Sequence, residues 1–234
     1  MKTQSLLSLH AGQYALQSGI EYWQLMADQL PEVEATTPTP SASPFFSTLP
    51  DSSPAPNALF FDLDYSSTDA LRSHPFFKRN IGPTRLLVDK HASSAGGVFS
   101  AARFTTGEGT IDIALERIRQ ITEKFDHFQG FQIHFALHGG TGAGICGGLL
   151  PKLHSEFPKK AIHLFNLMPS DKLAVSTVEP INALFGLEAI EPADLVVCMD
   201  NASLYRYFTE NCDTGLPNYH SLNYLIARTL VAIN

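Results

Sequence analysis

Apolar runs of strand length alternate with segments of helical periodicity along most of the chain. At the start, Leu6–Leu9 predicts a short buried strand. The apolar residues Ile20, Trp23 and Met26 then recur at helical spacing, which predicts a helix directly after that strand. This helix is expected to end near Leu30.

The alternation resumes after residue 57 and continues to the end of the sequence. Strands are predicted at Ala58–Leu63, Arg85–Val88, Phe131–Leu137, Ala161–Leu167 and Asp194–Met199. Helices are predicted from about Thr68 and at Thr110–Phe125, Ala143–Phe157, Thr177–Leu187, Asn201–Phe208 and Tyr219–Ile233. Strands that alternate with helices indicate an α/β fold with a Rossmann-like, mostly parallel sheet and helices on both faces. Ligands bind such sheets at the carboxyl ends of the strands.

Residues 31–57 interrupt this pattern. They contain seven prolines, many Ser and Thr residues, and no Lys or Arg. A segment of this composition cannot bury enough apolar surface to offset the entropy lost on ordering. We therefore interpret residues 31–57 as a flexible insertion, with Phe45 and Phe46 as its one candidate anchor, inside a single domain that spans residues 1–234.

The charge balance narrows the function classes. The chain carries 16 Lys and Arg residues against 23 Asp and Glu residues, a net charge of −7, with no basic cluster. An acidic surface without a basic patch argues against nucleic acid as a partner. No apolar run reaches the roughly 18–20 residues that span a bilayer, and the N-terminus lacks a signal-peptide pattern, so no membrane partner is expected. Three widely spaced cysteines are typical of reduced thiols in a cytosolic protein.

The strongest local signal is a glycine-rich turn between a predicted strand and a predicted helix. Glycines occupy four of the six positions 139–144. They let backbone N–H groups approach an anion closely, and the first N–H groups of the following helix add donors and a favourable dipole. The turn therefore predicts a phosphate cradle without a lysine. The alternative is a tight turn that serves close helix–sheet packing and binds no ligand.

Two nucleotide-binding interpretations of this turn compete. Gly142, Gly144 and Gly147 fit the dinucleotide fingerprint G-x-G-x-x-G. That fingerprint also needs an acidic residue for the ribose near the end of the next strand, which here ends at Asn166–Met168. The interpretation of the chain as an NAD-type oxidoreductase therefore rests on these three glycines alone. No G-x-x-x-x-G-K-[ST] sequence occurs, so an ordinary P-loop is excluded.

The second interpretation is a family resemblance. Residues 139–144 resemble most of the G-G-G-T-G-S/T-G signature of tubulins and of the bacterial division GTPase FtsZ. Other segments match in tubulin order: Ala11-Gly12-Gln13 with Gln17 and Gly19, Asp62-Leu63-Asp64, Leu71–Phe76, Gln129–Gln132, Val178–Ala183, Asp200-Asn201, Leu204-Tyr205, Tyr219 and Leu222-Asn223. Because these matches span nearly the whole chain, it resembles the nucleotide-binding domain of a divergent tubulin, of eukaryotic type rather than FtsZ.

The resemblance implies a site for GTP or GDP with Mg²⁺ and assigns residues to it by position. The implied nucleotide contacts are Gln13, Tyr14, Asp64, Gly96, Gly97, Gly139, Gly140, Thr141, Gly142, Glu179, Asn201, Tyr219 and Asn223, and the implied metal contacts are Asp62 and Asp64. Residues 139–142 would cradle the α- and β-phosphates, and Glu179 would approach the ribose. Asn201 and Asn223 would read guanine through their amides, with Tyr219 stacked on the base. Carboxylates suit a hard cation that keeps several waters, although Asp62 alternatively caps a turn.

Several positions depart from the family pattern. Tyr14 replaces a cysteine, His138 the first signature glycine, Ala136 a serine, Gly97-Val98 an asparagine pair, and Val175 an aspartate. Lost contacts at these positions predict guanine-nucleotide binding that is specific but weaker by roughly two or three orders of magnitude. The alternative is a degenerate interaction module with no bound nucleotide.

The length of 234 residues bears on hydrolysis. The intermediate and C-terminal domains of tubulins have no counterpart in this sequence. In that family a loop and a helix that lie further along the chain complete the site for hydrolysis. We therefore expect little intrinsic hydrolysis of GTP. We name no catalytic residue and leave open whether the chain is an enzyme. An exposed apolar patch is expected near Leu230–Asn234. The resemblance implies a structural or regulatory role in the cytoplasm and cytoskeleton, with tubulin subunits or microtubule ends as partners.

Overall fold

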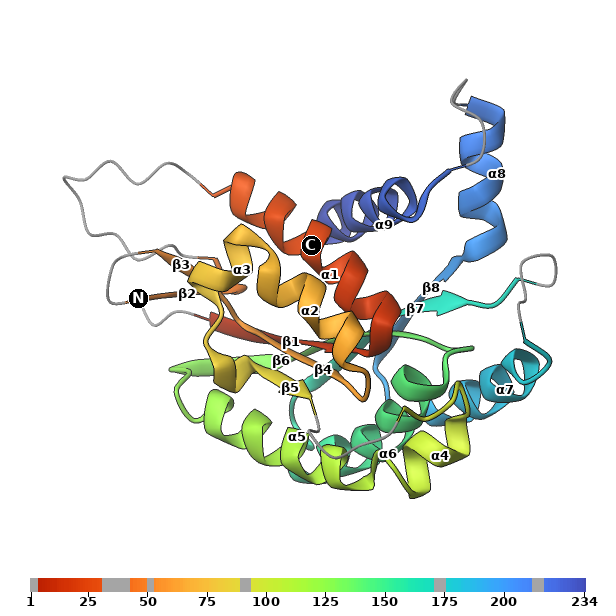
Figure 1. The fold of residues 1–234 in the computed structure, drawn as a ribbon. Helices are drawn as coiled ribbons and strands as arrows, with labels where there is room; N and C mark the ends of the chain where they lie inside the picture. The colour runs from red at the N-terminus through yellow and green to blue at the C-terminus, as the bar shows by residue number, and fades with distance from the viewer. Residues whose placement is uncertain (1–3, 31–42, 50–52, 89–93, 171–175, 212–216) are drawn as a thin grey trace.

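A six-stranded sheet forms the centre of the protein in the computed structural model, which describes residues 4–30, 43–49, 53–88, 94–170, 176–211 and 217–234 (Figure 1). Its strands are β1 (Gln4–Ala11), β4 (Ala58–Asp62), β5 (Leu86–Val88), β6 (His127–Ala136), β7 (Ala161–Met168) and β8 (Leu195–Asp200). The order across the sheet is β5-β4-β1-β6-β7-β8, and every neighbouring pair is parallel. The predicted α/β fold with a mostly parallel sheet is confirmed.

Helices cover both faces of this sheet (Figure 1). One face carries α1 (Gly12–Asp28), α2 (Tyr65–Ser73), α3 (Pro75–Asn80) and α9 (Tyr219–Ile233). The other face carries α4 (Phe99–Phe104), α5 (Glu108–Thr122), α6 (Gly140–Glu156) and α7 (Glu179–Ala189). The remaining helix, α8 (Asn201–Asn211), follows β8, and a short 3₁₀ turn, η1 (Pro83–Arg85), precedes β5.

Three of these helices differ from the sequence prediction. α2 begins at Tyr65 rather than near Thr68, because the carboxylate of Asp64 accepts a hydrogen bond from the backbone N–H of Ser66 at 2.9 Å and caps the helix. The sequence pattern does not predict α3 or α4, since six residues are too few to establish a helical period.

The strand order places a ligand crevice between β1 and β6. From β1 the chain builds outward through β4 to β5, and it then returns to add β6, β7 and β8 on the other side. Where the direction of building reverses, the loops after the two flanking strands diverge and leave a crevice at the carboxyl edge of the sheet. The loop after β1 leads into Gly12 and the loop after β6 leads into the glycine turn.

The described part of the insertion is a β-hairpin, not a flexible segment. β2 (Phe46–Thr48) pairs antiparallel with β3 (Pro54–Pro56), and the rings of Phe45 and Phe46 are buried in the core. Asn57 supports the hairpin, since its Nδ2 donates to the carbonyl of Pro44 at 3.2 Å. β3 tolerates its prolines because, among the described strands, it pairs with β2 alone and so leaves one edge unpaired. Residues 31–42 and 50–52, which also belong to the predicted flexible insertion, lie outside the described residues.

Four aromatic rings form a continuous buried column across four neighbouring strands. Strand register pairs Phe60 with His10, His10 with His134, and His134 with Phe165. The ring centroids lie 4.6, 4.5 and 5.1 Å apart along the column, at interplanar angles of 12°, 4° and 15°. All four side chains are at most 1% exposed. Two imidazoles are therefore stacked inside the layer that α1 covers.

His10 joins this column to α1. Its Nδ1 lies 3.2 Å from the carbonyl oxygen of Ala15, and the indole Nε1 of Trp23 donates to its Nε2 at 3.0 Å. These partners require a neutral ring with the proton on Nδ1. Gly19 permits the close approach, since a Cβ there would lie 2.9 Å from His10 Nδ1. The pKa of His10 lies well below its usual value, first because of burial and second because of the neighbouring His134.

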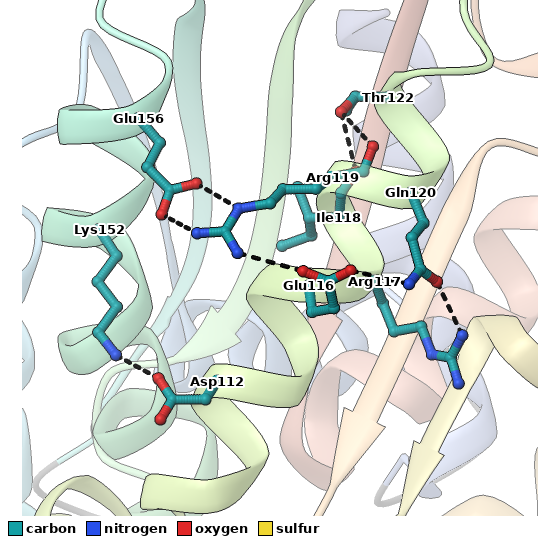
Figure 2. A network of polar contacts seen from close by, with 9 residues as sticks. All are labelled: Asp112, Glu116, Arg117, Ile118, Arg119, Gln120, Thr122, Lys152 and Glu156. Carbon is teal, nitrogen blue, oxygen red and sulfur yellow. Dashed lines mark hydrogen bonds and ion pairs between the residues drawn. The ribbon is translucent and has the colours of Figure 1, made fainter.

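Polar contacts on the surface join α5 to α6 (Figure 2). Arg119 bridges Glu116 on its own helix and Glu156 on α6, and Lys152 Nζ lies 2.5 Å from Asp112 Oδ1. All of these groups are at least partly exposed, so water and salt screen their attraction. The packing of α5 and α6 on the sheet therefore rests mainly on their buried apolar residues.

Four large apolar side chains of α7 are exposed together, whereas the end of the last helix exposes fewer. Ile181, Leu184, Phe185 and Leu187 are 55%, 66%, 41% and 45% exposed. In α9, where the patch was expected, Leu230 is buried against the α1 side of the core and Ile233 is exposed. Among the described residues, no helix combines the length and apolar character needed to cross a membrane.

Candidate functional site

The loops after β1 and β6 interlock through two glycines. Gly12 adopts the left-handed region with φ +79°, and a Cβ there would lie 2.9 Å from the backbone N of Gly142. A Cβ on Gly142 would lie 2.7 Å from the carbonyl oxygen of Ala11. Any side chain at either position would push the loops apart. The two loops therefore form one backbone-lined floor at the crevice.

A third loop closes on the same floor. A Cβ on Gly140 would lie 2.3 Å from the carbonyl carbon of Gly97 and 2.4 Å from the N of Val98. Gly96 and Gly97 both have positive φ, +61° and +75°, in the turn that carries this peptide. Gly140 thus has to be glycine because the backbone of the 97–98 peptide occupies the space of its side chain.

Asn182 on α7 fixes the third loop to the glycine turn. Its Oδ1 accepts from the N–H of Phe99 at 2.9 Å, and its Nδ2 donates to the carbonyls of Gly97 and His138 at 2.7 and 3.0 Å. The side chain is buried. One amide therefore satisfies three backbone groups of two loops that are distant in sequence. This bracing role was missed in the sequence, although Asn182 lies in a segment that resembles the family.

Replacing Asn182 with alanine is expected to lower the free energy of unfolding by about 2–4 kcal/mol, because one buried N–H and two carbonyls lose their partners. Chemical denaturation measures this loss. The matched control is Asn211→Ala on exposed α8, where Nδ2 donates to the carbonyl of Tyr207 and, within the described part of the chain, makes no other hydrogen bond. This change should stay within about 0.5 kcal/mol. Equal stability of the two variants would show that Asn182 does not brace the loops.

A cavity of about 320 Å³ opens above these loops. It is lined by Ala11, Gly12, Gln13, Tyr14, Asp62, Asp64, Ser67, Ser94, Gly97, Ala136, His138, Gly139, Gly140, Thr141 and Gly142. The first turns of α1 and α6 both face it, and neither has a side-chain cap or an acidic residue in that turn. Two helix N-termini with unsatisfied N–H donors and positive dipole ends suit a phosphate.

Two carboxylates lie at the side of this cavity. Asp62 is buried, and its Oδ1 accepts from the N–H of Leu63 at 2.7 Å and of Asp64 at 3.3 Å. Its Oδ2 is buried and meets no donor with good hydrogen-bond geometry among the described residues, although the Ser67 side chain is close enough to lower the pKa of this carboxyl. Burial is the main cause that raises the pKa of Asp62, against the lowering effect of its hydrogen bonds. Through Oδ1, Asp62 caps the turn at residues 62–64, which is the alternative role that its sequence position left open. The neighbouring Asp64 caps α2 and is exposed.

A second cavity, of about 450 Å³, lies between α1, α8 and α9. Its lining comprises Gln13, Tyr14, Gln17, His138, Leu167, Ser170, Glu179, Asn201, Tyr205, Tyr219, Leu222, Asn223 and Ile226. Leu222 and Ile226 are buried and give it an apolar floor, while Tyr219 is 76% exposed at its rim. Amides, a tyrosine ring and an apolar floor together suit a flat heterocyclic base.

Gln13, Tyr14 and His138 line both cavities, so they mark the junction between them. His138 precedes Gly139, which has extended backbone at φ −77° and begins α6 without any left-handed residue. Burial lowers the pKa of His138, whereas the carboxylate of Glu179 and the backbone of Leu167 raise it. The two cavities are therefore neighbours that share these three residues, and we refer to them together as the cleft.

The structure brings together nearly all of the implied site residues. The resemblance implies fourteen different site residues. All of them except Gly96 line the cleft. Gln17, Ser67 and Tyr205 also line it. Gln17 and Tyr205 lie in segments that resemble the family but were given no contact, and Ser67 was missed because it is an ordinary polar position of a helix in the sequence. Val175, one of the departures from the family pattern, lies outside the described residues.

Comparisons with known proteins agree with this geometry. The Tubulin/FtsZ family, GTPase domain, matches residues 5–209. The tubulin beta chain of Aspergillus fumigatus is 30% identical over 239 residues, which cover 97% of this chain and 52% of that protein. The tubulin alpha-6 chain of Naegleria pringsheimi is 30% identical over 236 residues, and the tubulin alpha-1 chain of Arabidopsis thaliana 29% identical over 238, with the same coverage. The chain spans about half the length of these relatives. Since the family match covers most of its residues, the chain belongs to the Tubulin/FtsZ family through its GTPase domain.

Proposed function

We propose that this chain binds a guanine nucleotide, GTP or GDP, across the two cavities. The observation that carries the proposal is the shared lining: a phosphate-type cavity and a base-type cavity meet at Gln13, Tyr14 and His138. The cleft lies at the switch point of a parallel sheet, where such folds bind nucleotides. The family of the chain supports the same ligand class.

In the proposed complex, backbone N–H groups hold the phosphates. Gly140, Thr141 and Gly142 form the first turn of α6, and Gly12 and Gln13 begin α1. Their amides point along two helix axes toward the phosphate cavity, and the Thr141 hydroxyl adds a donor. Among the described residues that line the cavity, none is Lys or Arg. Phosphate binding therefore depends on the backbone geometry of the glycine loops.

The residues present fit a Mg²⁺ ion bound together with the phosphates. The buried Oδ2 of Asp62 and the exposed carboxylate of Asp64 line the same cavity. Mg²⁺ typically takes one or two carboxylates, several waters and substrate phosphates, so it needs no cluster of three protein ligands, and none occurs among the described residues. When bound, the ion would neutralise charge on the phosphate oxygens.

At the other end, α8 and α9 supply groups for the base. Asn201 begins α8, directly after Asp200, whose carboxylate caps that helix by accepting from the N–H groups of Ala202 and Ser203. Asn223 lies on α9, one turn after Tyr219. Each amide offers a donor and an acceptor to one base edge, and the Tyr219 ring can cover the face of the base. Glu179 lines the same cavity near the junction and suits a sugar hydroxyl.

We further propose binding with little intrinsic hydrolysis. Hydrolysis of a nucleoside triphosphate needs positive groups that stabilise charge in the transition state and a residue that orients the water. The backbone amides, and Mg²⁺ held by the two carboxylates, would supply positive charge at the phosphates, but we assign no residue of the described lining to orient the water. The proposed site of action is the cytoplasmic cytoskeleton, where the chain would act beside tubulin subunits or at microtubule ends. Mg²⁺ would be bound with the phosphates.

Calorimetric titration with GDP, GTP and ATP in the presence of Mg²⁺ tests the proposed function. We expect heat of binding with both guanine nucleotides and at least tenfold weaker binding of ATP, a difference of about 1.4 kcal/mol. Asp64→Asn should weaken GTP only when Mg²⁺ is present. No heat with any nucleotide would refute the proposal and favour an interaction module whose cleft binds none.

A further inference from the structure

Helix α7 places its small residues inside and its large apolar residues outside. The buried positions are Asn182, Ala183 and Gly186. Gly186 lies so close to the chain after β6 that a Cβ there would be 2.6 Å from the carbonyl oxygen of Leu137. A helix that covers a sheet ordinarily turns its large apolar residues toward the core. In α7 this arrangement is reversed, so packing on the core does not account for its large apolar residues.

These large residues share one outward face of the helix. Ile181, Leu184, Phe185 and Leu187 are between 41% and 66% exposed, and helical spacing places them within roughly half of the helix circumference. Glu188 is exposed on the same face. We call these five residues the outer face of α7. Several large apolar side chains exposed side by side are typical of an interaction site. None of the five lines either cavity, so this surface is separate from the cleft.

The buried side of α7 holds the outer face in a fixed position. The Asn182 amide bonds the backbone of Gly97, Phe99 and His138. The ring of Phe99 is stacked on the ring of Phe185, with centroids 5.4 Å apart. A surface that is already ordered loses little conformational freedom when a partner binds. The outer face of α7 is therefore a preformed surface for docking.

The charge around this face distinguishes between possible occupants. Between Ser176 and Tyr205 the sequence has no Lys, Arg or His and five acidic residues: Glu179, Glu188, Glu191, Asp194 and Asp200. Two cations of the helices beside α7 are engaged elsewhere. Arg103 of α4 lies over the ring of Phe104, and Lys152 of α6 pairs with Asp112 on α5. The outer face of α7 therefore combines exposed apolar side chains with negative charge.

Negative charge disfavours two of the possible occupants. A second copy of this chain would bring one acidic face against another, and cytoplasmic membrane surfaces are themselves anionic. We propose that the outer face of α7 docks a helix of another protein whose apolar stripe is flanked by Lys or Arg. Such a helix packs its stripe on Leu184 and its neighbours and pairs its cations with Glu188 and Glu191. The proposal goes beyond nucleotide binding and does not depend on it.

The test compares two synthetic amphipathic peptides that share one leucine stripe, flanked by lysine in the first and by glutamate in the second. Fluorescence anisotropy of the labelled peptides measures their binding to the whole chain without nucleotide. We expect saturable binding of the lysine peptide and roughly tenfold or more weaker binding of the glutamate peptide. Leu184→Ala should weaken the lysine peptide by roughly tenfold, and Glu188→Lys should remove most of the preference between the peptides.

Exposed residues of similar type on α5 provide the matched controls. Ile113→Ala and Glu123→Lys should leave the binding of both peptides as in the unaltered protein. Thermal melts confirm that all four variants fold. Binding of neither peptide, or binding of the lysine peptide that Leu184→Ala and Glu188→Lys leave unchanged, would overturn the inference. A dimer in sedimentation velocity that Leu184→Ala dissociates would assign the face to a second copy and would also overturn it.

Discussion

As the pH falls below about 6.5, the free energy of unfolding should drop by about 1.4 kcal/mol per pH unit for each of two buried histidines. His10 and His134 are stacked inside the core and almost fully buried. Burial lowers the pKa of His134 to about 3 and holds that of His10 well below its usual value. Both rings therefore stay neutral in the folded protein while the unfolded chain binds protons.

The sign of this pH dependence follows from the number of protons that the folded and unfolded states bind. Below pH 6.5 the unfolded state binds more protons than the folded state, so stability falls as pH falls. For His134 the loss continues down to its folded pKa of about 3 and amounts to roughly 5 kcal/mol there. Protonation of His10 would also set two donors against each other at the bond from Trp23, which would loosen α1.

Denaturation midpoints measured from pH 7.5 to 4.5 test this effect. His134→Phe should remove the share of one histidine from the slope, whereas any packing cost of the larger ring should be the same at every pH. His154→Gln on the surface of α6 is the control and should keep the slope of the unaltered protein. A slope that His134→Phe leaves unchanged would show that this ring does not stay neutral in the core.

Gly140→Ala is expected to weaken GDP binding by about a hundredfold, the loss of two charge-assisted hydrogen bonds of roughly 1.5 kcal/mol each. The added Cβ would lie 2.3 Å from the backbone of Gly97, and backbone cannot move aside as a flexible side chain can. Either the first turn of α6 or the 97–98 peptide must shift, and the phosphate cavity lies between them. Overpacking should also cost about 1–3 kcal/mol of stability.

The neighbouring glycine gives a graded comparison. A Cβ on Gly139 would lie 3.6 Å from the nearest atom, an ordinary contact, so Gly139→Ala should weaken GDP far less than Gly140→Ala. Gly109→Ala on α5, where a Cβ meets nothing within 4 Å, controls for the general effect of adding a methyl group. Titration calorimetry and thermal melts separate affinity from stability. Equal affinities for Gly139→Ala and Gly140→Ala would contradict the interlocked loops.

Much of the fold was predictable because strand and helix periods are local properties of a sequence. The six central strands and all but the shortest helices lie close to their expected ranges. The hairpin at Phe46–Pro56 was not predictable in the same way. Its composition is typical of a flexible segment, and its order comes from the burial of Phe45 and Phe46 in a core built by distant residues.

The residues of the candidate site were likewise predictable only where a short sequence motif identifies them. Residues of the glycine turn and of Asp62–Asp64 follow directly from short motifs. The bracing by Asn182 and the stacking of His10 on His134 depend on contacts across 44 or more positions, or on strand register, which no local pattern fixes. The meeting of two cavities at Tyr14 and His138 likewise depends on how β1 and β6 lie next to each other.

Hydrogen–deuterium exchange with and without saturating GDP tests most directly whether the two cavities form one nucleotide site. We predict slower exchange at both ends of the cleft: at residues 12–14 and 140–142 by the phosphates, and around Asn201 and residues 219–223 by the base. ADP should protect the phosphate end more than the base end. Protection in other segments only, or none at saturating GDP, would contradict the account.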